Sequence, residues 1–423
     1  MEKFAGYGFN KSHAAAYSLL AYHTAWIKVH CTAEFFAANM TVEADNTDKL
    51  KVLLADAKLF GITFDPPDIN RGTAHFEPVD DQRVRYGLAA VKGSGTGAVE
   101  AIVAARDGTA GHEGQGSGPF RSLFDFCARV DRQRVNKRAV EALIKAGAFD
   151  ALHADRAATL ASVSLAFDWA DTQAAHAQQA GLFDFGDASD NHGSSTQEPA
   201  LVHVPAWTLH EKLMQEKSAI GYYLSGHLFD AWAPEVRRFA RRAIADLVDS
   251  REPQLLAGIV TDARTVNGQR GRVVIFKLDD GSEAVESVVN EELIESRREL
   301  FVEDQLIVVQ GRLQPDRFSG GLRLNVNAVW DLAGARARFG RYLAVHINGG
   351  VPPVADVLRL WPARKVAGEH GALTQGLAVR LRLQRSTATA ELDLGDDARF
   401  WPCDEALGRW RGIAEGGAVV VYE

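Results

Sequence analysis

The sequence has few cysteines, no long hydrophobic run and no excess of basic charge. Its three cysteines, Cys31, Cys127 and Cys403, are odd in number and lie far apart. Such a set excludes a paired disulfide framework and a four-ligand zinc site, and it suits a reducing compartment. The longest uncharged apolar run, residues 14–27, is too short to span a bilayer, and the start of the chain does not resemble a signal peptide. We therefore expect a soluble, cytoplasmic protein.

The overall charge gives no sign of a nucleic-acid-binding protein. The chain carries 47 Lys and Arg against 55 Asp and Glu, a formal charge of −8. Binding to nucleic acid would therefore have to come from local basic patches. A length of 423 residues exceeds what one hydrophobic core usually serves, and at ~150 residues per domain it predicts about three domains.

Helical and strand-like patterns occupy different parts of the chain. Residues 14–40 read as one helix with apolar residues on most faces, which we expect to be well buried. The region 254–332 instead has strand patterns, separated in part by the turn signals Asn267-Gly268 and Asp280-Gly281. The expected strands are 255–266, 272–280, 283–289, 305–314 and 322–331, with a charged helix over 291–301 before the fourth. Five strands with a helix in this place are the OB-fold order.

Between the helical and strand-rich regions lies a polar stretch that contains isolated apolar residues. Residues 171–200 hold five acids and no Lys or Arg, a composition that predicts a solvated linker. The linker nevertheless carries Gln179, Leu182 and Phe183, and a linker offers nothing to cover the last two.

A glycine-rich stretch opens the chain and runs into the first helix. Asn10 or Ser12 could simply cap that helix. Lys11 and the free N–H groups of a helix N-terminus could also bind a phosphate.

This stretch carries a family resemblance. Residues 4–18 resemble the fingers of the bacterial replicative DNA polymerase III alpha subunit, a C-family polymerase. Further matches follow in the family's order, and together they extend the resemblance over the whole chain. They are residues 22–28, 33–35, 66–70, 87–93, 147–150 and 221–227. The order of these motifs identifies the chain with the C-terminal part of that subunit.

The resemblance implies a multidomain α+β chain with six parts. These are a helical remnant of the fingers, a tandem helix-hairpin-helix region that binds duplex DNA, a flexible linker with a motif for the sliding clamp, a helical connector, an OB-fold β-barrel and a small C-terminal α/β domain for the tau subunit of the clamp loader. The expected boundaries are 1–75, 76–170, 171–206, 207–250, 251–333 and 334–423.

The resemblance also implies which residues face the incoming dNTP. They are Tyr7, Asn10, Lys11, Ser12 and His13. Two Mg²⁺ ions serve the full polymerase, held by palm aspartates that precede this segment in the family. We expect none of the catalytic aspartates here and no activity from this fragment alone. The remaining candidate carboxylates are interpreted as solvated surface groups: Asp279, Asp280, Glu391, Asp393, Asp396 and Asp397.

The segment 91–102 has the pattern of a helix-hairpin-helix. Its glycine turn would direct backbone N–H groups at a DNA phosphate without reading sequence, although Ser94 replaces the usual apolar middle residue. The expected contacts are Lys92, Gly93, Gly95, Thr96 and Gly97. Residues 130–150 resemble a degenerate second copy, within a stretch 121–145 that has seven basic and three acidic residues. Its expected backbone contacts are Arg132, Arg134, Lys137 and Arg138. A solvated helix face is the simpler alternative.

The barrel is a weaker candidate for binding. Residues 254–331 contain nine basic and thirteen acidic residues, and aromatics are few. Single-stranded template could still follow one basic edge. That edge comprises Arg264, Arg270, Arg272 and Lys277. A purely structural role is the alternative.

The linker motif now has an interpretation. Gln179, Leu182 and Phe183 match the family's clamp-binding pentapeptide, so the beta sliding clamp is the expected partner. Two alternatives to a replicative polymerase remain. One is an error-prone paralogue in mutagenic repair, and the other is a stand-alone, non-catalytic module that binds DNA and the clamp.

Overall fold

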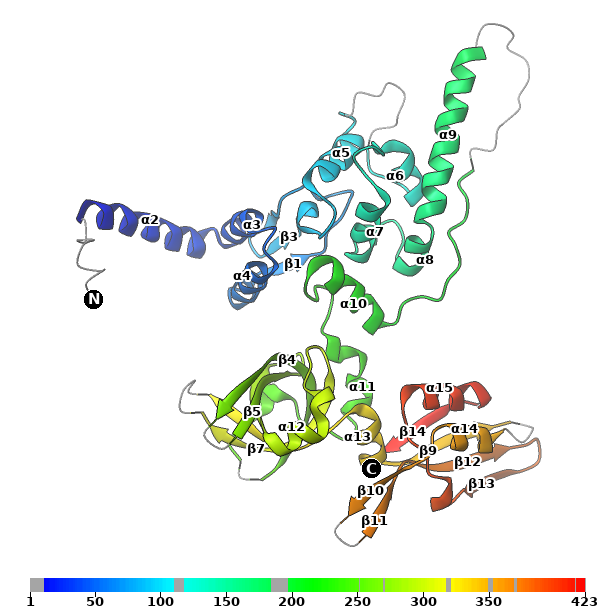
Figure 1. Cartoon of the computed structure of the whole chain (residues 1–423). Helices are drawn as coiled ribbons and strands as arrows, with labels where there is room; N and C mark the ends of the chain where they lie inside the picture. Colours follow the sequence, from blue (N-terminus) through cyan, green and yellow to red (C-terminus); the bar gives the residue numbers. More distant parts are fainter. Residues whose placement is uncertain are drawn as a thin grey trace. The chain divides into compact units, whose positions relative to one another are not determined.

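The computed structural model contains two compact units, residues 1–226 and 227–423, which Figure 1 draws together without fixing their relative positions. The described residues are 11–109, 118–183, 197–250, 252–268, 271–316, 321–348, 353–368, 371–414 and 416–422. Within these ranges, no helix combines the length and the apolar character that crossing a membrane requires.

The first unit begins with three helices. They are α2 (Lys11–His30), α3 (Thr32–Val42) and α4 (Thr47–Leu59). The single helix expected over 14–40 is therefore divided at Cys31. Helix α3 buries Phe36 and Met40 completely, and α4 begins where the Asn46 side chain accepts a hydrogen bond from the Lys49 N–H.

Helix α2 is not buried, and our expectation for it was wrong. Tyr17, Leu20 and Tyr22 are 60%, 59% and 65% exposed. Figure 1 shows α2 extending away from the rest of its unit. Near its C-terminal end, Lys28 forms a 2.6 Å ion pair with Asp56. The apolar residues lie on most faces as expected, but the described residues supply no surface to cover them.

A small sheet and seven further helices complete the described part of the first unit. The sheet has the order β1-β3-β2, with β1 (Thr63–Asp65), β2 (Glu77–Asp80) and β3 (Arg83–Arg85). The helices are η1 (Leu88–Ala90), α5 (Thr96–Asp107), α6 (Leu123–Arg129), α7 (Lys137–Lys145), α8 (Arg156–Ala161), α9 (Val163–Phe183) and α10 (Leu209–Ile220). Polar side chains fix the start of α6, α7 and α8, because Ser122, Asn136 and Asp155 accept hydrogen bonds from the first-turn N–H groups.

A buried ionic cluster fastens the end of this unit to its helical core. The Arg156 guanidinium donates two hydrogen bonds of 2.7 Å to Asp150 and one of 3.4 Å to Glu216. The second Glu216 oxygen accepts the N–H groups of Leu224 and Ser225 at 2.8 and 2.9 Å. Glu216 is fully buried and Arg156 is 4% exposed. The Glu216 carboxylate therefore links Arg156 to the segment after α10, and both of its oxygens accept hydrogen bonds.

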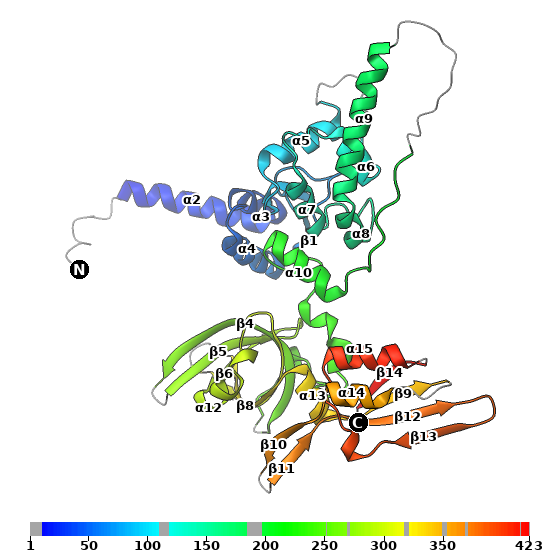
Figure 2. The ribbon, with the colours of Figure 1, turned by 45° about the vertical axis from the view of Figure 1, so that its right-hand side comes forward.

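The second unit contains a closed five-stranded barrel with the order β4-β5-β6-β8-β7, visible in Figure 2. Its elements are β4 (Gln254–Gly268), β5 (Gly271–Asp279), β6 (Ala284–Asn290), α12 (Glu291–Arg297), β7 (Leu306–Pro315) and β8 (Leu322–Trp330). The helix lies between the third and fourth strands, so the expected OB-fold is confirmed. One detail differs: the β4–β5 ladder continues to Gly268 and Gly271, so the expected turn at Asn267-Gly268 lies inside it.

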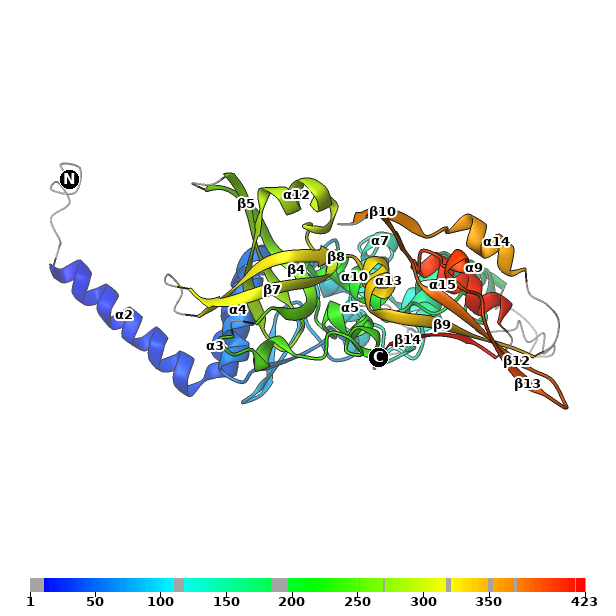
Figure 3. The same ribbon diagram turned by 90° about the horizontal axis from the view of Figure 1, so that it is seen from below.

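The C-terminal part is a mixed sheet covered by helices on one face, seen from below in Figure 3. The strand order is β13-β12-β9-β14. The elements are β9 (Gly340–Ile347), α14 (Val354–Leu360), β10 (Arg364–Gly368), β11 (Gly371–Gln375), β12 (Ala378–Gln384), β13 (Thr389–Asp393), α15 (Asp404–Ile413) and β14 (Ala418–Tyr422). Leu343, Val345 and Trp410 form part of the core between sheet and helices. The expected multidomain α+β fold is confirmed.

A buried arginine joins the barrel to the C-terminal part. Arg336 lies on α13 (Leu332–Phe339), which connects the two, and is 3% exposed. It pairs with Glu235 of α11 (Ala233–Val236) at 2.7 Å and with Asp404 at 2.6 Å. The Tyr422 hydroxyl donates to Glu235 at 2.6 Å. Burial alone would raise the pKa of Glu235, but its hydrogen bond and ion pair with Arg336 lower it.

Candidate nucleic-acid interface

The predicted hairpin joins η1 to α5 and has the backbone conformation of a tight glycine turn. Gly93 and Gly95 have φ of 88° and 71°, in the left-handed region that favours glycine. Ser94, which replaces the expected apolar residue, is buried between them. Its hydroxyl lies 2.9 Å from the Leu88 carbonyl oxygen and 2.7 Å from that of Val91. Because the hydroxyl finds acceptors within the turn, it can occupy the buried position that an apolar side chain would otherwise fill.

The outer side of this turn is open. Lys92, Gly93, Gly95, Thr96 and Gly97 are all exposed. Thr96 and Gly97 also begin α5, and the first N–H groups of a helix have no acceptor within the helix. These groups, together with the helix dipole, favour an anion at this end. The structure therefore brings the five predicted residues together on one exposed turn at a helix N-terminus.

The sequence reasoning missed one residue at this turn. Gly221 ends α10 with φ of 100°, and the ammonium of Lys92 lies beside it. A side chain on Gly221 would approach Lys92 Nζ within 3.0 Å. The main chain of Lys92 is held in the same place, because its N–H donates to the Ala219 carbonyl at 2.8 Å. The glycine in the 221–227 motif was visible in the sequence, but its contact with Lys92 depends on tertiary structure.

The four basic residues predicted around α7 are not equivalent. Arg132 pairs with Asp171, and Lys137 lies 3.7 Å from Asp168; both acids are on α9. Arg134 pairs with Glu100 of α5 at 3.1 Å. Arg138 alone of the four is exposed without an acidic partner among the described residues. These internal pairs reduce the positive charge that the composition of 121–145 had indicated.

The segment between α6 and α7 differs from the first hairpin. Its turn is closed by Asp131, whose carbonyl accepts the N–H groups of Arg134 and Val135 at 3.1 and 2.8 Å. Residues 131–136 contain no glycine. A second helix–turn–helix is therefore present, but it lacks the glycine turn that exposes backbone N–H groups in the first.

The predicted basic edge of the barrel is largely compensated by acids. Lys277 pairs with Asp262 at 2.7 Å, and Arg264 lies 3.9 Å from Glu286. Arg270 lies outside the described residues. Of these residues, Arg272 alone has a guanidinium that pairs with no acidic side chain among the described residues.

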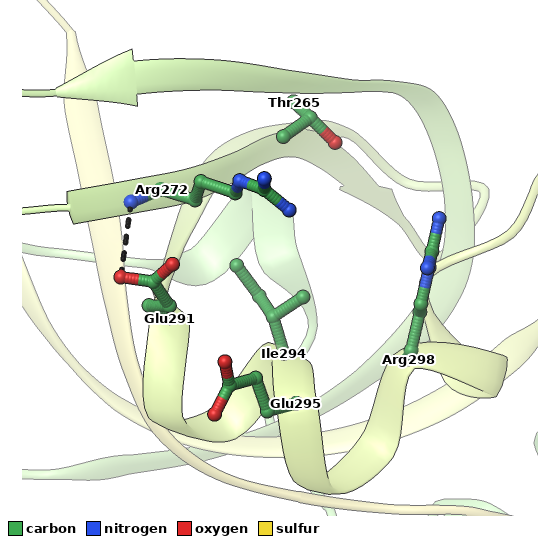
Figure 4. A pocket seen from close by; sticks show the side chains of 6 residues that line it. All are labelled: Thr265, Arg272, Glu291, Ile294, Glu295 and Arg298. Carbon is green, nitrogen blue, oxygen red and sulfur yellow. Dashed lines mark hydrogen bonds between the residues drawn. The ribbon is translucent and has the colours of Figure 1, made fainter.

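Arg272 faces a shallow cavity of about 350 Å³ between the barrel and α12. Figure 4 shows its side chain and that of Arg298 on either side of Ile294, with Glu291 and Glu295 below. Glu291 accepts the Arg272 backbone N–H at 3.4 Å. Sequence reasoning missed Arg298, because it follows a helix whose orientation on the barrel could not be foreseen. The mixed charge of this cavity does not favour one class of ligand.

The residues expected to face a nucleotide are only partly described. Tyr7 and Asn10 lie outside the described residues, and of Lys11 and Ser12 only the helical backbone at the start of α2 is described. His13 is exposed and its ring lies 4.4 Å from that of Tyr17.

The predicted clamp motif lies at the end of a helix. Helix α9 runs to Phe183, so residues 171–183, expected as linker, have a helical backbone. The side chains of Gln179, Leu182 and Phe183 lie outside the described set.

Several candidate carboxylates are engaged by basic side chains. Asp393 pairs with Arg380 at 2.7 Å and Asp396 with Arg399 at 2.8 Å. Our interpretation of Asp280 as a solvated group was wrong. Asp280 is 5% exposed, pairs with Arg237, and accepts the Ile244 N–H at 2.9 Å. Burial would raise the pKa of Asp280, but hydrogen bonds from Ser282 and Arg237 lower it. In the described part of the chain, no three His, Cys, Asp or Glu side chains are grouped to hold a metal, so these residues do not fit a Mg²⁺ site.

Two family models match the regions just described. A helix-hairpin-helix motif model matches residues 61–159, and an OB-fold nucleic acid binding domain model matches residues 255–332. A small single-stranded DNA-binding protein from Streptomyces coelicolor covers 20% of this chain at 21% identity, over 97% of its own length, with a TM-score of 0.18, too low to bear on function.

Three relatives named DNA polymerase III subunit alpha match the chain at 37–44% identity. The relative from Neisseria meningitidis serogroup B is 44% identical over 82% of this chain and 29% of its own length. Those from Vibrio cholerae and Escherichia coli K12 are 38% and 37% identical over 96% and 98% of this chain, and over 34% and 35% of their own lengths. The chain thus spans about a third of the relatives it matches.

Proposed function

The chain is a homologue of the bacterial DNA polymerase III alpha subunit, and we propose that it holds duplex DNA for such a polymerase. The observation that carries the proposal is the glycine turn before α5. It combines two left-handed glycines, exposed N–H groups at a helix N-terminus and an adjacent lysine. A helix-hairpin-helix model fits the same region.

The grip would be independent of sequence. Backbone N–H groups and Lys92 can contact phosphates but do not read base edges. Arg138 would add a second basic contact from α7. Arg132, Arg134 and Lys137 would contribute less, because a phosphate must first replace their carboxylate partners. Exposed ion pairs of this kind are weak, about 0–1 kcal/mol, so the exchange would lower each contribution without abolishing it.

The remaining roles concern the whole polymerase. Template-directed DNA synthesis would need Mg²⁺ and palm carboxylates, which we place outside these residues. Other parts of the polymerase would then cover the exposed apolar surface of α2. Residues 7–13 would lie near the incoming dNTP. In this proposal the fragment alone has no polymerase activity. The polymerase to which it belongs is cytoplasmic.

Two protein partners complete the proposal. The 179–183 pentapeptide would bind the beta sliding clamp, and the C-terminal domain would bind the tau subunit of the clamp loader. A clamp tether serves a processive replicase, which favours the replicative function over an error-prone repair paralogue. A stand-alone module that binds DNA and the clamp would share the same duplex grip.

Duplex binding by the full chain tests the proposal. The double substitution of Lys92→Glu and Arg138→Glu should weaken binding to a fluorescent 20-base-pair duplex by about tenfold or more at low salt, because two phosphate contacts are lost. The matched control is Lys51→Glu with Lys58→Glu on α4. Both lysines are exposed, and neither has an ion pair among the described residues. The control makes the same change in charge within the same unit. Equal loss in both double variants, or no loss in the first, would refute the grip.

A further inference from the structure

Two short arginine-rich segments, distant in the sequence, meet in the second unit. Residues 237–242 contain four arginines and one phenylalanine, and residues 336–341 contain three arginines and one phenylalanine. Neither segment contains an acid. The first follows α11 and the second spans the end of α13 and the start of β9. Contacts with β14 place both segments at one end of that strand.

The two phenylalanines form the centre of an aromatic cluster. The rings of Phe239 and Phe339 are stacked, with centroids 5.5 Å apart and planes 8° apart. Tyr422 lies 5.1 Å from Phe239, and Trp330 meets Phe339 edge-on at 5.3 Å. All four side chains are only partly buried. The cluster therefore joins barrel and sheet while leaving part of its aromatic surface open to solvent.

Three exposed arginines lie next to residues of this cluster in the chain or on the neighbouring strand. Arg238 and Arg338 are the chain neighbours of the stacked phenylalanines, and Arg341 lies where the β9–β14 register shifts, beside Tyr422. Arg238 also donates to the Val420 carbonyl at 3.3 Å. None of the three has an acidic partner among the described residues.

The acidic groups at this junction are already engaged. Glu235 accepts two hydrogen bonds from Arg336, at 2.7 and 2.8 Å, and one from Tyr422. Asp404 is also paired with Arg336. Among the described residues, no acidic side chain therefore pairs with the three exposed arginines. This contrasts with the predicted edge of the barrel, where Arg264 and Lys277 each have an acid close by.

We propose that this surface, Arg238, Arg338 and Arg341 around the Phe239–Phe339 stack, binds single-stranded nucleic acid. A single strand presents phosphates and unpaired base faces at the same time. Basic side chains follow the phosphates, and aromatic and guanidinium planes stack with the bases. A duplex hides its base faces, so the aromatic part of the surface would gain nothing from it. The inference does not depend on the polymerase function, since it rests on these contacts alone.

Fluorescence anisotropy with the full chain tests the surface, with oligo-dT and oligo-rU of 20 nucleotides as probes. Arg338→Glu with Arg341→Glu should weaken binding of the preferred strand by about tenfold or more at low salt. Loss of two phosphate contacts should also reduce the slope of log K against log salt by about 1.4. Arg338→Lys with Arg341→Lys keeps the charge and should retain most of the salt slope.

The matched control is Arg382→Glu with Arg385→Glu on the β12–β13 hairpin. These arginines are exposed, belong to the same unit and give the same change in charge. The control should change binding by less than about twofold, in keeping with a local effect. Equal weakening in both double variants would overturn the proposal. Unchanged binding of the single strand by the variant with Arg338→Glu and Arg341→Glu would also overturn it. So would a loss of duplex binding by this variant that equals its loss of single-strand binding.

Discussion

Replacing Glu216 by alanine should loosen the segment that follows α10 without unfolding the barrel. The Glu216 carboxylate is fully buried. It accepts the N–H groups of Leu224 and Ser225 at 2.8 and 2.9 Å and lies 3.4 Å from the Arg156 guanidinium. Removing one partner of a buried ion pair costs about 3–5 kcal/mol. We expect about 3 kcal/mol, because Arg156 keeps its two hydrogen bonds to Asp150.

Hydrogen exchange measures this loss where it occurs. A cost of about 3 kcal/mol corresponds to exchange about 100-fold faster at the amides of residues 222–226, since 1.4 kcal/mol is a factor of ten. Peptides from β5, in the other unit, should be unchanged. The control Glu43→Ala removes an exposed pair with Lys49 at 2.7 Å, which should cost at most about 1 kcal/mol. Unchanged exchange at 222–226 in the Glu216→Ala variant would refute the role given to the buried carboxylate.

Three further outcomes are expected. Changing Leu182 and Phe183 to alanine should abolish binding to the beta sliding clamp in a pull-down while leaving circular dichroism unchanged; undiminished binding would contradict the tether. The pKa of Asp280 is lowered in the folded state, so its contribution to stability is full above its unfolded pKa and lost as pH falls through the folded value. Thermal melts of Asp280→Asn should therefore show a weaker loss of stability on acidification than the unsubstituted chain. Finally, primer extension by this chain with Mg²⁺ and dNTPs should be absent, and robust extension would show that a catalytic centre is present here.

Local patterns predicted those elements whose signals lie within a few residues. Strands β5 and β6 alternate in burial along much of their length, and Asp280-Gly281 does reverse the chain between them. Each of these features is decided by neighbouring residues, and for this reason the fold class could be read from the sequence.

The errors concern contacts between distant residues. The composition of 121–145 indicated a basic surface, but Arg132 and Lys137 meet Asp171 and Asp168 on a helix more than thirty positions away. Helix α2 has the composition of a buried helix, yet burial depends on what lies against it. Likewise, the sequence did not indicate Arg338 and Arg341 as a binding surface, because the stacking of Phe339 on Phe239 is a tertiary contact. Ion pairing and burial depend on tertiary contacts, and the local pattern of a single sequence does not reveal those contacts.

Hydrogen exchange of the full chain with and without a 20-base-pair duplex tests the central claim, that the glycine turn before α5 holds duplex DNA. The claim predicts slower exchange in peptides that cover residues 91–99, where the exposed N–H groups of the turn would meet phosphates. A smaller change is expected over 136–140, around Arg138. Exchange in α15, which takes no part in the grip, should stay the same. Protection confined to the barrel, or no protection over 91–99 at a saturating duplex concentration, would contradict the claim.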